Sequence, residues 1–423
     1  MLQEGNKIDM ESAGLRGGSD AGRLEALLLP DAIRVCPVGS DPLAVVHQWL
    51  SAIAFGYQFY GESSDFNAEK VIAGLWNVGA LNSRQKFREK LFEDVIFPPV
   101  SDPVFKFIDL FSGIGGFRLA LQQNGGLSVF SSEWDTSAQK TYRSNFGEVP
   151  FGDITALTNE SVTDQELDEM LPSHDLLAAG FPCQPFSHAG VSARSSVGKD
   201  HGFKCKTQGT LFFDVMRIAS VKRPKVLFLE NVRNIVGHDQ GYTFSVVQDS
   251  IEEIGYEFKY SIVDASSLVP QRRVRCYMVC FRKDLGVDFC FPSFDGAPRS
   301  LNTILEEDVD ERFTISDKLW AGHINRTRKN LERGTGFTAF TADLNKPAHT
   351  LVARYGKDGK ECLVPQEGKN PRLLTPRECA RLQGFPEGFK IPVAKTQAYR
   401  QFGNSVPVPV VTEIAQSIVR NLI

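Results

Sequence analysis

The stretch FIDLFSGIGGFRLAL, residues 107–121, decides which fold we expect of this chain. Its first apolar residues predict a strand, its glycines (Gly113, Gly115 and Gly116) predict a tight turn, and its last residues predict an amphipathic helix. A glycine turn between a strand and a helix lets the backbone pass close to a ligand at the helix start. The spacing is not GxGxxG, so two interpretations stay open: a nucleotide-like ligand site, or a turn that only packs helix against sheet.

Short apolar runs follow this stretch at intervals long enough for a helix. They are LSVFSSE, HDLLAAGF, PKVLFLENV, EFKYSIVDA and RVRCYMVCF, and the run FKFIDLF begins the series. Such runs, alternating with amphipathic stretches, are typical of a mostly parallel sheet with crossover helices. We therefore predict an α/β fold with a Rossmann-like, doubly wound sheet.

The chain divides into four segments by sequence pattern. Residues 1–102 contain the stretches PLAVVHQWLSAIAFGYQFY and NAEKVIAGLWNVGAL, which predict helices, and they end at the proline-rich IFPPVSDP. Residues 103–290 carry the strand pattern, residues 291–372 lose it, and residues 373–423 return to helix-forming sequence. We predict a mostly helical N-terminal extension, a sheet domain, a smaller separate domain, and a C-terminal segment that returns to the sheet domain.

The composition is that of an ordinary globular protein, with 42% hydrophobic and 23% charged residues and a net charge of −4. No apolar run reaches the roughly 18 residues needed to span a bilayer, and the N-terminus lacks a signal-peptide pattern. We therefore expect a cytoplasmic protein without a membrane partner. The eight cysteines show no paired CxxC of zinc-site spacing, so we expect free thiols and no metal.

Polar residues stand where predicted strands end, which is the edge at which open α/β sheets bind ligands. Glu133, about twenty residues beyond the glycine turn, is placed to bind two ribose hydroxyls. Glu230 and Asn231 end the strand LFLENV, and a carboxyl group near apolar walls can have a raised pKa and donate a proton. Arg273 and Arg275 alternate along a strand, so they share a face and suit phosphate or a developing anion. Taken alone, Glu230 is more commonly a helix-capping or loop acid. Arg273 and Arg275, taken alone, more commonly belong to a solvated strand edge.

Cys183 lies in AAGFPCQPFSHAG, residues 178–190, between two prolines. The stretch has neither helical nor strand periodicity, so we predict a loop. Loops held by a rigid scaffold often carry reactive groups, but a free cysteine is more often a small buried hydrophobe. The stretch alone leaves both interpretations open.

Together, these residues and their order resemble the C5-cytosine DNA methyltransferases. The motifs DLFSGIGG, GFPCQPFS, QGTLFFD, LENV, QRRVR, RLLTPRECARLQGFP and YRQFGNSV occur in sequence order between Phe105 and Ile423. The resemblance implies a methyltransferase sheet that uses S-adenosylmethionine, with a target-recognition domain at residues 291–372. It leaves the N-terminal extension outside the shared region.

The resemblance also implies a role for each candidate catalytic residue. Cys183 is the implied nucleophile, which attacks carbon 6 of a cytosine flipped out of the duplex. Glu230 is the implied acid that contacts ring nitrogen 3 and the exocyclic amine, and Asn231 is expected to support that contact through its backbone. Arg273 is expected to hold the carbonyl oxygen of the base, and Arg275 to hold the Glu230 carboxylate or a neighbouring phosphate.

S-adenosylmethionine is the cofactor that the resemblance implies. The residues expected to bind it are Phe111, Gly113, Ile114 and Gly116 at its methionine part, Glu133 at its ribose, Trp134, Asp153 and Ile154 at its adenine, and Gly180, Pro182, Leu211, Asn404, Ser405 and Val406 along the remaining walls. The segment Ser187–Gln208, behind the nucleophile, is longer than the resemblance leads us to expect.

The charge distribution favours DNA contact in the predicted recognition domain. From Gly322 to Thr375 the chain has ten Lys or Arg and five Asp or Glu, whereas the first hundred residues have nine and thirteen. A solvated β-rich surface is the alternative for this region. The residues expected to contact DNA are Arg354, Tyr355 and Lys357 in this domain, and Gln184 and Ser187 behind Cys183.

The resemblance further implies a monomer that acts on double-stranded DNA and is paired in function with a restriction endonuclease. It suggests a short GC-rich palindrome as the recognition site, with GGNNCC and CCWGG as the candidates. Two alternatives stay open, namely the same chemistry on RNA and a non-catalytic DNA-binding regulator that acts through residues 1–100. The presence of Cys183 and Glu230 argues against a chain that has lost catalysis.

Overall fold

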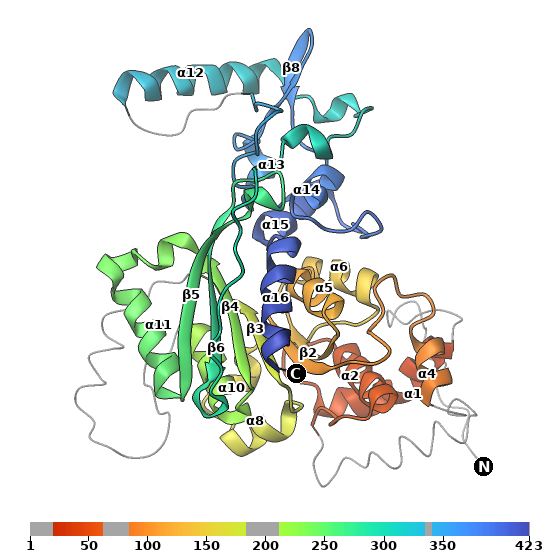
Figure 1. Ribbon diagram of the computed structural model, residues 1–423. Helices are drawn as coiled ribbons and strands as arrows, with labels where there is room; N and C mark the ends of the chain where they lie inside the picture. The colour runs from red at the N-terminus through yellow and green to blue at the C-terminus, as the bar shows by residue number, and fades with distance from the viewer. Residues whose placement is uncertain (1–19, 62–83, 183–210, 335–340, 423) are drawn as a thin grey trace.

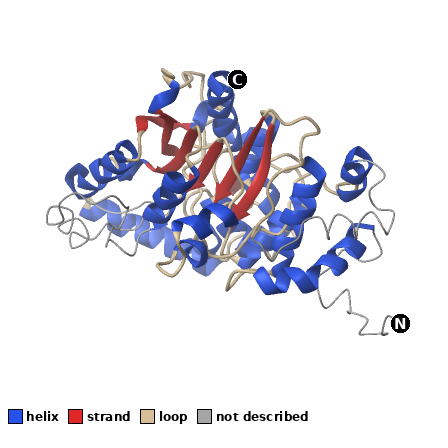
Figure 2. Cartoon of the chain, turned by 90° about the horizontal axis from the view of Figure 1, so that it is seen from below, coloured by secondary structure: helices blue, strands red, loops and turns tan. Residues whose placement is uncertain are grey.

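The computed structural model describes residues 20–61, 84–182, 211–334 and 341–422. Its centre is a six-stranded sheet in the order β2-β1-β3-β4-β6-β5, which lies between helices in Figure 2. The strands are β1 (Phe105–Leu110), β2 (Gly126–Ser132), β3 (Leu176–Gly180), β4 (Val226–Val232), β5 (Tyr256–Asp264) and β6 (Val274–Arg282). The pairs β1–β2, β1–β3 and β3–β4 are parallel, and β6 runs antiparallel to β4 and β5. The predicted mostly parallel α/β sheet is therefore confirmed, and each predicted apolar run forms a strand.

Helices cover both faces of the sheet, as alternate residues of the strands show. Ile108 and Leu110 of β1 belong to one core together with α1 (Asp20–Val35), α2 (Pro42–Phe55), α8 (Asp164–Met170), α10 (Leu211–Lys222) and α11 (Tyr242–Glu253). Phe105 and Phe107 belong to the other core together with α5 (Gly116–Gln123), α6 (Thr136–Phe146), α14 (Pro376–Leu382), α15 (Lys395–Asn404) and α16 (Val408–Leu422). Burial on both faces explains why the central strands read as continuous apolar runs.

The strand order creates a ligand crevice between β1 and β3. From β1 the chain moves outward to β2, and from β3 it moves to β4 on the other side, so the direction of winding reverses between β1 and β3. Open α/β sheets bind ligands at such a reversal, outside the carboxyl ends of the strands. The glycine turn after β1 and the loop that starts at Phe181 after β3 both begin there.

The N-terminal helices pack against the edge of the sheet formed by β2 (Figure 1). Asp41 accepts a hydrogen bond from the Leu43 amide at 2.9 Å and caps α2, in which residues 43–54 are all buried. α4 (Arg84–Leu91) packs against α2. The predicted helix over NAEKVIAGLWNVGAL lies outside the described residues.

The chain between the sheet and α14 forms the upper part of Figure 1. Its main elements are α12 (Asp317–Arg333), the short α13 (Tyr355–Asp358), and the hairpin of β7 (Val364–Gln366) and β8 (Lys369–Arg372). Ser316 caps the start of α12, and Gly334 ends it in the left-handed conformation with a φ of 64°.

The C-terminal helix α16 returns to the glycine-turn side of the sheet and packs on α5. The Asn124 side chain donates to the Thr412 carbonyl at 3.3 Å, and the Thr412 hydroxyl donates to Gln123 Oε1 at 3.1 Å. The last helix therefore completes the layer around the turn that the sequence places near a ligand. Within the described ranges, no helix combines the length and apolar character that crossing a bilayer requires.

Candidate active site

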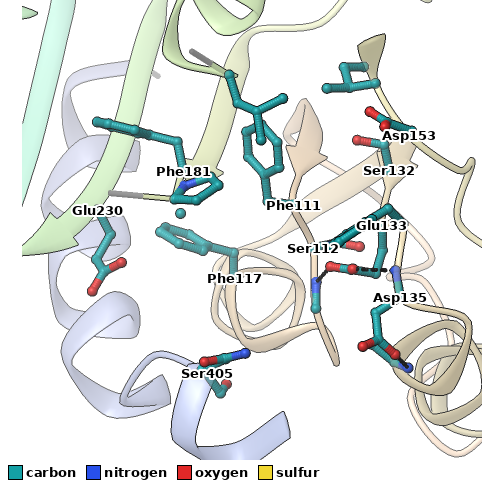
Figure 3. Close-up of a pocket in the computed structure, with 18 of the residues that line it drawn as sticks. Phe111, Ser112, Phe117, Ser132, Glu133, Asp135, Asp153, Phe181, Glu230 and Ser405 are labelled. Carbon is teal, nitrogen blue, oxygen red and sulfur yellow. Dashed lines mark hydrogen bonds between the residues drawn. The ribbon is translucent and has the colours of Figure 1, made fainter. Parts of the chain in front are cut away.

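A cavity of about 1210 Å³ opens at the carboxyl ends of the parallel strands (Figure 3). Its lining includes every residue expected to bind the cofactor, together with Glu230, Asn231, Arg273 and Arg275. Cys183, Gln184 and Ser187 lie outside the described residues, but Pro182, the residue before Cys183, lines the cavity. The structure therefore brings residues from six separate sequence motifs into one space.

The glycine turn both packs the helix and lines the cavity, so the two interpretations left open by its spacing are compatible. Gly113 and Gly115 have φ values of 55° and 86°, a region that favours glycine. A Cβ at Gly115 would lie 2.2 Å from the Phe146 ring, and one at Gly116 would lie 2.8 Å from Val406 Cγ2. Gly115 and Gly116 thus allow close packing, while Gly113 turns its amide toward Glu133.

Glu133 is fixed at the end of β2 by backbone amides. Its Oε2 accepts from the Gly113 amide and its Oε1 from the Asp135 amide, both at 2.8 Å. Burial raises the pKa of Glu133, and these amide hydrogen bonds oppose the rise. Each carboxylate oxygen has a second lone pair, so the side chain can still accept hydrogen bonds from two hydroxyl groups in the cavity.

A segment at the edge of β2 forms the next wall of the cavity. The Phe151 amide donates to the Ser131 carbonyl at 2.8 Å, and the Glu133 amide donates to the Phe151 carbonyl at 2.7 Å. Beyond Phe151, Asp153 is exposed and Ile154 is buried. Trp134 is 71% exposed and lines the same cavity, so it offers a flat apolar surface there.

Glu230 lies on the opposite side of the cavity from Glu133. In Figure 3 the rings of Phe111 and Phe117 stand between Glu230 and Glu133. The cavity thus has two acidic ends separated by aromatic side chains, and a different ligand group can occupy each end.

Glu230 is paired in register with Gly180 of β3, and the absence of a side chain at Gly180 leaves space beside its carboxyl group. Arg275 Nε lies 3.2 Å from Glu230 Oε1. Burial raises the pKa of Glu230, while the positive charges of Arg275 and Arg273 act in the opposite direction. Burial is the larger influence, so it favours the neutral carboxyl, which can both donate and accept hydrogen bonds.

The Asn231 side chain makes two hydrogen bonds, and its expected support of Glu230 through the backbone stays a prediction. Its Nδ2 donates to the Phe181 carbonyl at 3.0 Å, and its Oδ1 accepts from the Val232 amide at 2.8 Å. These bonds join the end of β4 to the loop that leads into Pro182.

Arg273 lines the cavity and is held by backbone carbonyls, while its expected contact with the base stays a prediction. It is 3% exposed, and its Nη1 and Nη2 donate to the carbonyls of Leu351, Gly403 and Ser405 at 3.0, 3.2 and 2.7 Å. Burial, followed by the charge of Arg275, lowers the pKa of Arg273 to about 9. The guanidinium therefore ties Leu351 and the end of α15 to the sheet.

Tyr355 is buried, which overturns its predicted contact with DNA. Its hydroxyl donates to the Cys362 carbonyl at 2.6 Å and accepts from the Leu374 amide at 2.8 Å, so it has no free edge to offer a base. Arg354 and Lys357, which flank it, are exposed and stay candidates for DNA contact.

Several cavity residues were missed by the sequence reasoning, among them Ser112, Phe117, Ser132, Asp135, Asp214 and Arg400. Asp135 accepts from the Ser137 and Ala138 amides and so caps α6, and its Oδ2 lies 3.2 Å from Arg400 Nη1. The signals for these two residues were present, because Asp135 follows Glu133 at a helix start and Arg400 stands in the motif YRQFGNSV. Ser112 and Asp214 likewise stand in the motifs DLFSGIGG and QGTLFFD, whereas Phe117 and Ser132 carry no such signal.

Comparison with known proteins identifies the family. Residues 105–420 match the model of the C-5 cytosine-specific DNA methylase family. The chain is 45% identical to the type II methyltransferase M.SsoII of Shigella sonnei over 332 residues, which are 77% of this chain and 83% of that protein. It is 47% identical to M1.ScrFI of Lactococcus lactis subsp. cremoris over 325 residues, 75% of this chain and 79% of that protein.

Solved structures agree in fold. The crystal structure of S. pombe Dnmt2 methyltransferase matches with a TM-score of 0.57 and 18% identity, covering 75% of this chain and 99% of that one. A putative DNA modification methyltransferase from an E. coli prophage matches with a TM-score of 0.54 and 24% identity, with the same coverage. By sequence, therefore, the chain belongs to the family of C-5 cytosine-specific DNA methylases and is a DNA cytosine-5 methyltransferase.

Proposed function

We propose that the chain binds S-adenosylmethionine at the Glu133 end of the cavity and a flipped cytosine of duplex DNA at the Glu230 end. The observation that supports this proposal is that a single cavity joins the two ends. Glu133, Asp153 and Trp134 line one part, and Glu230, Arg275 and Pro182 line the other.

The residues at the Glu133 end fit an adenosyl group. Glu133 keeps lone pairs for two ribose hydroxyls, exposed Asp153 can accept from the adenine amino group, and Trp134 provides a surface for the purine ring. Phe111, Gly113 and Ser405 would lie beside the methionine part. When bound, S-adenosylmethionine supplies an electrophilic methyl group. Among the described residues, no group of three His, Cys, Asp or Glu side chains is arranged to hold a metal ion.

At the other end, the chain's own residues make carbon 5 of cytosine nucleophilic. The Cys183 thiolate forms a bond to carbon 6, and the electron pair of the 5,6 double bond moves onto the ring. Neutral Glu230 donates a hydrogen bond to ring nitrogen 3 and accepts one from the exocyclic amine, while Arg275 keeps the carboxyl group in place. After methylation the proton on carbon 5 passes to water or hydroxide, its electron pair re-forms the 5,6 double bond, and Cys183 leaves carbon 6 as a thiolate.

The base must leave the helical stack to reach this cavity, since the reaction uses a face that is covered in duplex DNA. Arg354 and Lys357 are exposed at and beside α13, above α15 in Figure 1, where they can contact phosphates. The relatives named above are type II methyltransferases, so we propose that this enzyme is paired in function with a restriction endonuclease that recognises the same DNA site. Those relatives are bacterial, and we place the enzyme with the chromosome in the cytoplasm, acting as a monomer.

The test is methyl transfer with labelled S-adenosylmethionine to duplex DNA, single-stranded DNA and transfer RNA, followed by mass spectrometry of the nucleosides. We expect 5-methylcytosine in duplex DNA alone, and bisulfite sequencing of DNA from cells that express the protein then gives the site. Methylation of the exocyclic amine or preferential labelling of RNA would refute the proposal. Binding of DNA without any transfer would favour a non-catalytic regulator.

A further inference from the structure

One wall of the cavity is held from both sides. We call residues 148–154 the wall segment and residues 20–61 the N-terminal layer. On the sheet side, Phe151 bridges Ser132 at the edge of β2, and its ring stacks on Phe130 with the centroids 4.5 Å apart. On the other side, the Tyr60 ring of the N-terminal layer lies 4.6 Å from Phe151, centroid to centroid. The wall segment is thus enclosed between the sheet and the N-terminal layer.

The N-terminal layer also accepts hydrogen bonds from the backbone of the wall segment. The Val149 amide donates to His47 Nδ1 at 2.9 Å, and the Gly152 amide donates to Ser40 Oγ at 2.8 Å. A Cβ at Gly152 would lie 2.5 Å from the Gly39 carbonyl oxygen, so a glycine is required for this close approach. The next residue along the chain is Asp153, whose carboxylate lines the cavity.

His47 is itself oriented by a buried carboxylate. Because a backbone amide can only donate, Nδ1 of His47 is the acceptor and the ring proton is on Nε2. Nε2 lies 3.0 Å from Oε1 of Glu25 and donates to it. His47 is 3% exposed and Glu25 is fully buried, so α1 sets the position of the imidazole that holds Val149. Two directed hydrogen bonds therefore connect Glu25 through His47 to Val149 of the wall segment.

We propose that the N-terminal layer sets the affinity of the enzyme for its cofactor by fixing the position of Asp153 and Ile154. Ser40 and His47 are the positioning residues, and they act through the backbone of Gly152 and Val149. The family match begins at residue 105, so Ser40 and His47 lie outside the region shared with the family model, whereas Val149 and Gly152 lie inside it. The proposal depends on the proposed binding of S-adenosylmethionine at this wall.

The test uses the full chain and S-adenosylhomocysteine, with affinity measured by calorimetry. Ser40 is only partly buried, so Ser40→Ala removes one acceptor with little risk to folding. We expect a three- to tenfold weaker affinity, which is about the effect of one lost hydrogen bond. The KM for S-adenosylmethionine should rise by the same factor, whereas kcat at saturation and the affinity for DNA should not change.

The control is Asp41→Ala, the neighbouring residue, which removes a hydrogen bond inside the N-terminal layer at the start of α2. It should lower the melting temperature, because it removes a helix cap. It should leave cofactor affinity within about twofold of the wild-type value, because it removes no contact to the wall segment. For His47, the Asn variant keeps an acceptor near Nδ1 and should retain more affinity than the Leu variant.

The outcomes separate this inference from the function on which it depends. If the wild type binds S-adenosylhomocysteine and Ser40→Ala binds it equally well, the inference is wrong and the proposed function stands. Equal losses in Ser40→Ala and Asp41→Ala would show a general effect of stability and would also refute the inference. If the wild type does not bind S-adenosylhomocysteine, both proposals are refuted.

Discussion

The Arg275 guanidinium Nε and the Glu230 carboxyl Oε1 lie 3.2 Å apart, and both side chains are nearly nine-tenths buried, at 13% and 12% exposure. Burial raises the pKa of Glu230 and the charge of Arg275 lowers it, so the two effects set the pH at which the carboxyl group loses its proton. The proposed mechanism needs the neutral form, and activity should fall as the pH rises through this pKa.

Arg275→Gln removes the charge that lowers the pKa of Glu230, so the alkaline fall in activity should move to higher pH. Arg275→Lys, which keeps the charge, is the control and should move it less. Glu230→Gln should lose this pH dependence and reduce the rate about 10²- to 10⁴-fold. Single-turnover methyl transfer from pH 5.5 to 9 measures all three, and an unchanged profile in Arg275→Gln would contradict the assignment of Glu230.

Cys183→Ser should abolish turnover, because an alkoxide forms far less readily than a thiolate near neutral pH. With duplex DNA that carries 5-fluorocytosine at the target, the wild type should remain covalently attached, since fluorine cannot leave carbon 5 as a cation. Denaturing electrophoresis and peptide mapping detect the adduct. The Ser variant should form none and still bind DNA, and an adduct at Cys205 or another thiol would show that the nucleophile is misassigned.

Glu133→Ala should weaken cofactor binding, because each charge-assisted hydrogen bond contributes about 1.5–3 kcal/mol. The same change leaves the Gly113 and Asp135 amides without their acceptor, so it should also lower the melting temperature. Glu133→Gln keeps one oxygen acceptor and should lose less of both. Calorimetry with S-adenosylhomocysteine and thermal unfolding give the two quantities, and unchanged affinity in Glu133→Ala would reject the ribose contact.

Asp109 of β1 should make stability depend on pH. It is fully buried, and burial raises its pKa to about 8. Between about pH 4 and pH 8 the folded chain therefore holds a proton that the unfolded chain has lost, so the free energy of unfolding falls as the pH rises. Asp109→Asn has no such group. Its melting temperature relative to the wild type should increase from pH 5 to pH 8.5, and a constant difference would contradict the buried neutral carboxyl.

Arg354→Ala should weaken binding to all DNA sequences alike and reduce the slope of log affinity against log salt by about one. Tyr355→Phe is the contrasting variant, because it leaves the Cys362 carbonyl and the Leu374 amide unpaired. It should lower stability by about 1–3 kcal/mol and leave the salt slope unchanged. Filter binding at several salt concentrations and denaturant unfolding separate the two effects.

The sheet could be predicted from sequence because its central strands β1, β3 and β4 are almost entirely buried and therefore appear as apolar runs. The glycine turn was predictable for a similar reason, since Gly113 and Gly115 need positive φ angles that other residues rarely adopt. In both cases the signal is local. A few neighbouring residues contain the physical cause of the structure.

The different roles of Arg273 and Arg275 could not be predicted, although their shared strand face could. Arg273 meets carbonyls at Leu351 and at residues 403–405, while Arg275 meets Glu230, and these contacts depend on how distant segments pack. Tyr355 is similar, because its burial depends on Leu374 and Tyr399. The local sequence around a charged or aromatic residue in a glycine-rich stretch does not indicate which distant residues will pack against it.

The packing of α16 on α5 has a consequence for synthesis of the enzyme. Asn124 and the Thr412 that it contacts are 288 residues apart, so a ribosome that adds about 5–20 residues per second needs roughly 15–60 s to make the second after the first. During that time the apolar side of α5 lacks its cover, and Val406, which packs on Gly116, has not yet been made. A nascent chain is therefore exposed to aggregation and to chaperones at α5 until α16 has been made, and the wall of the cavity that Val406 supplies is completed only then.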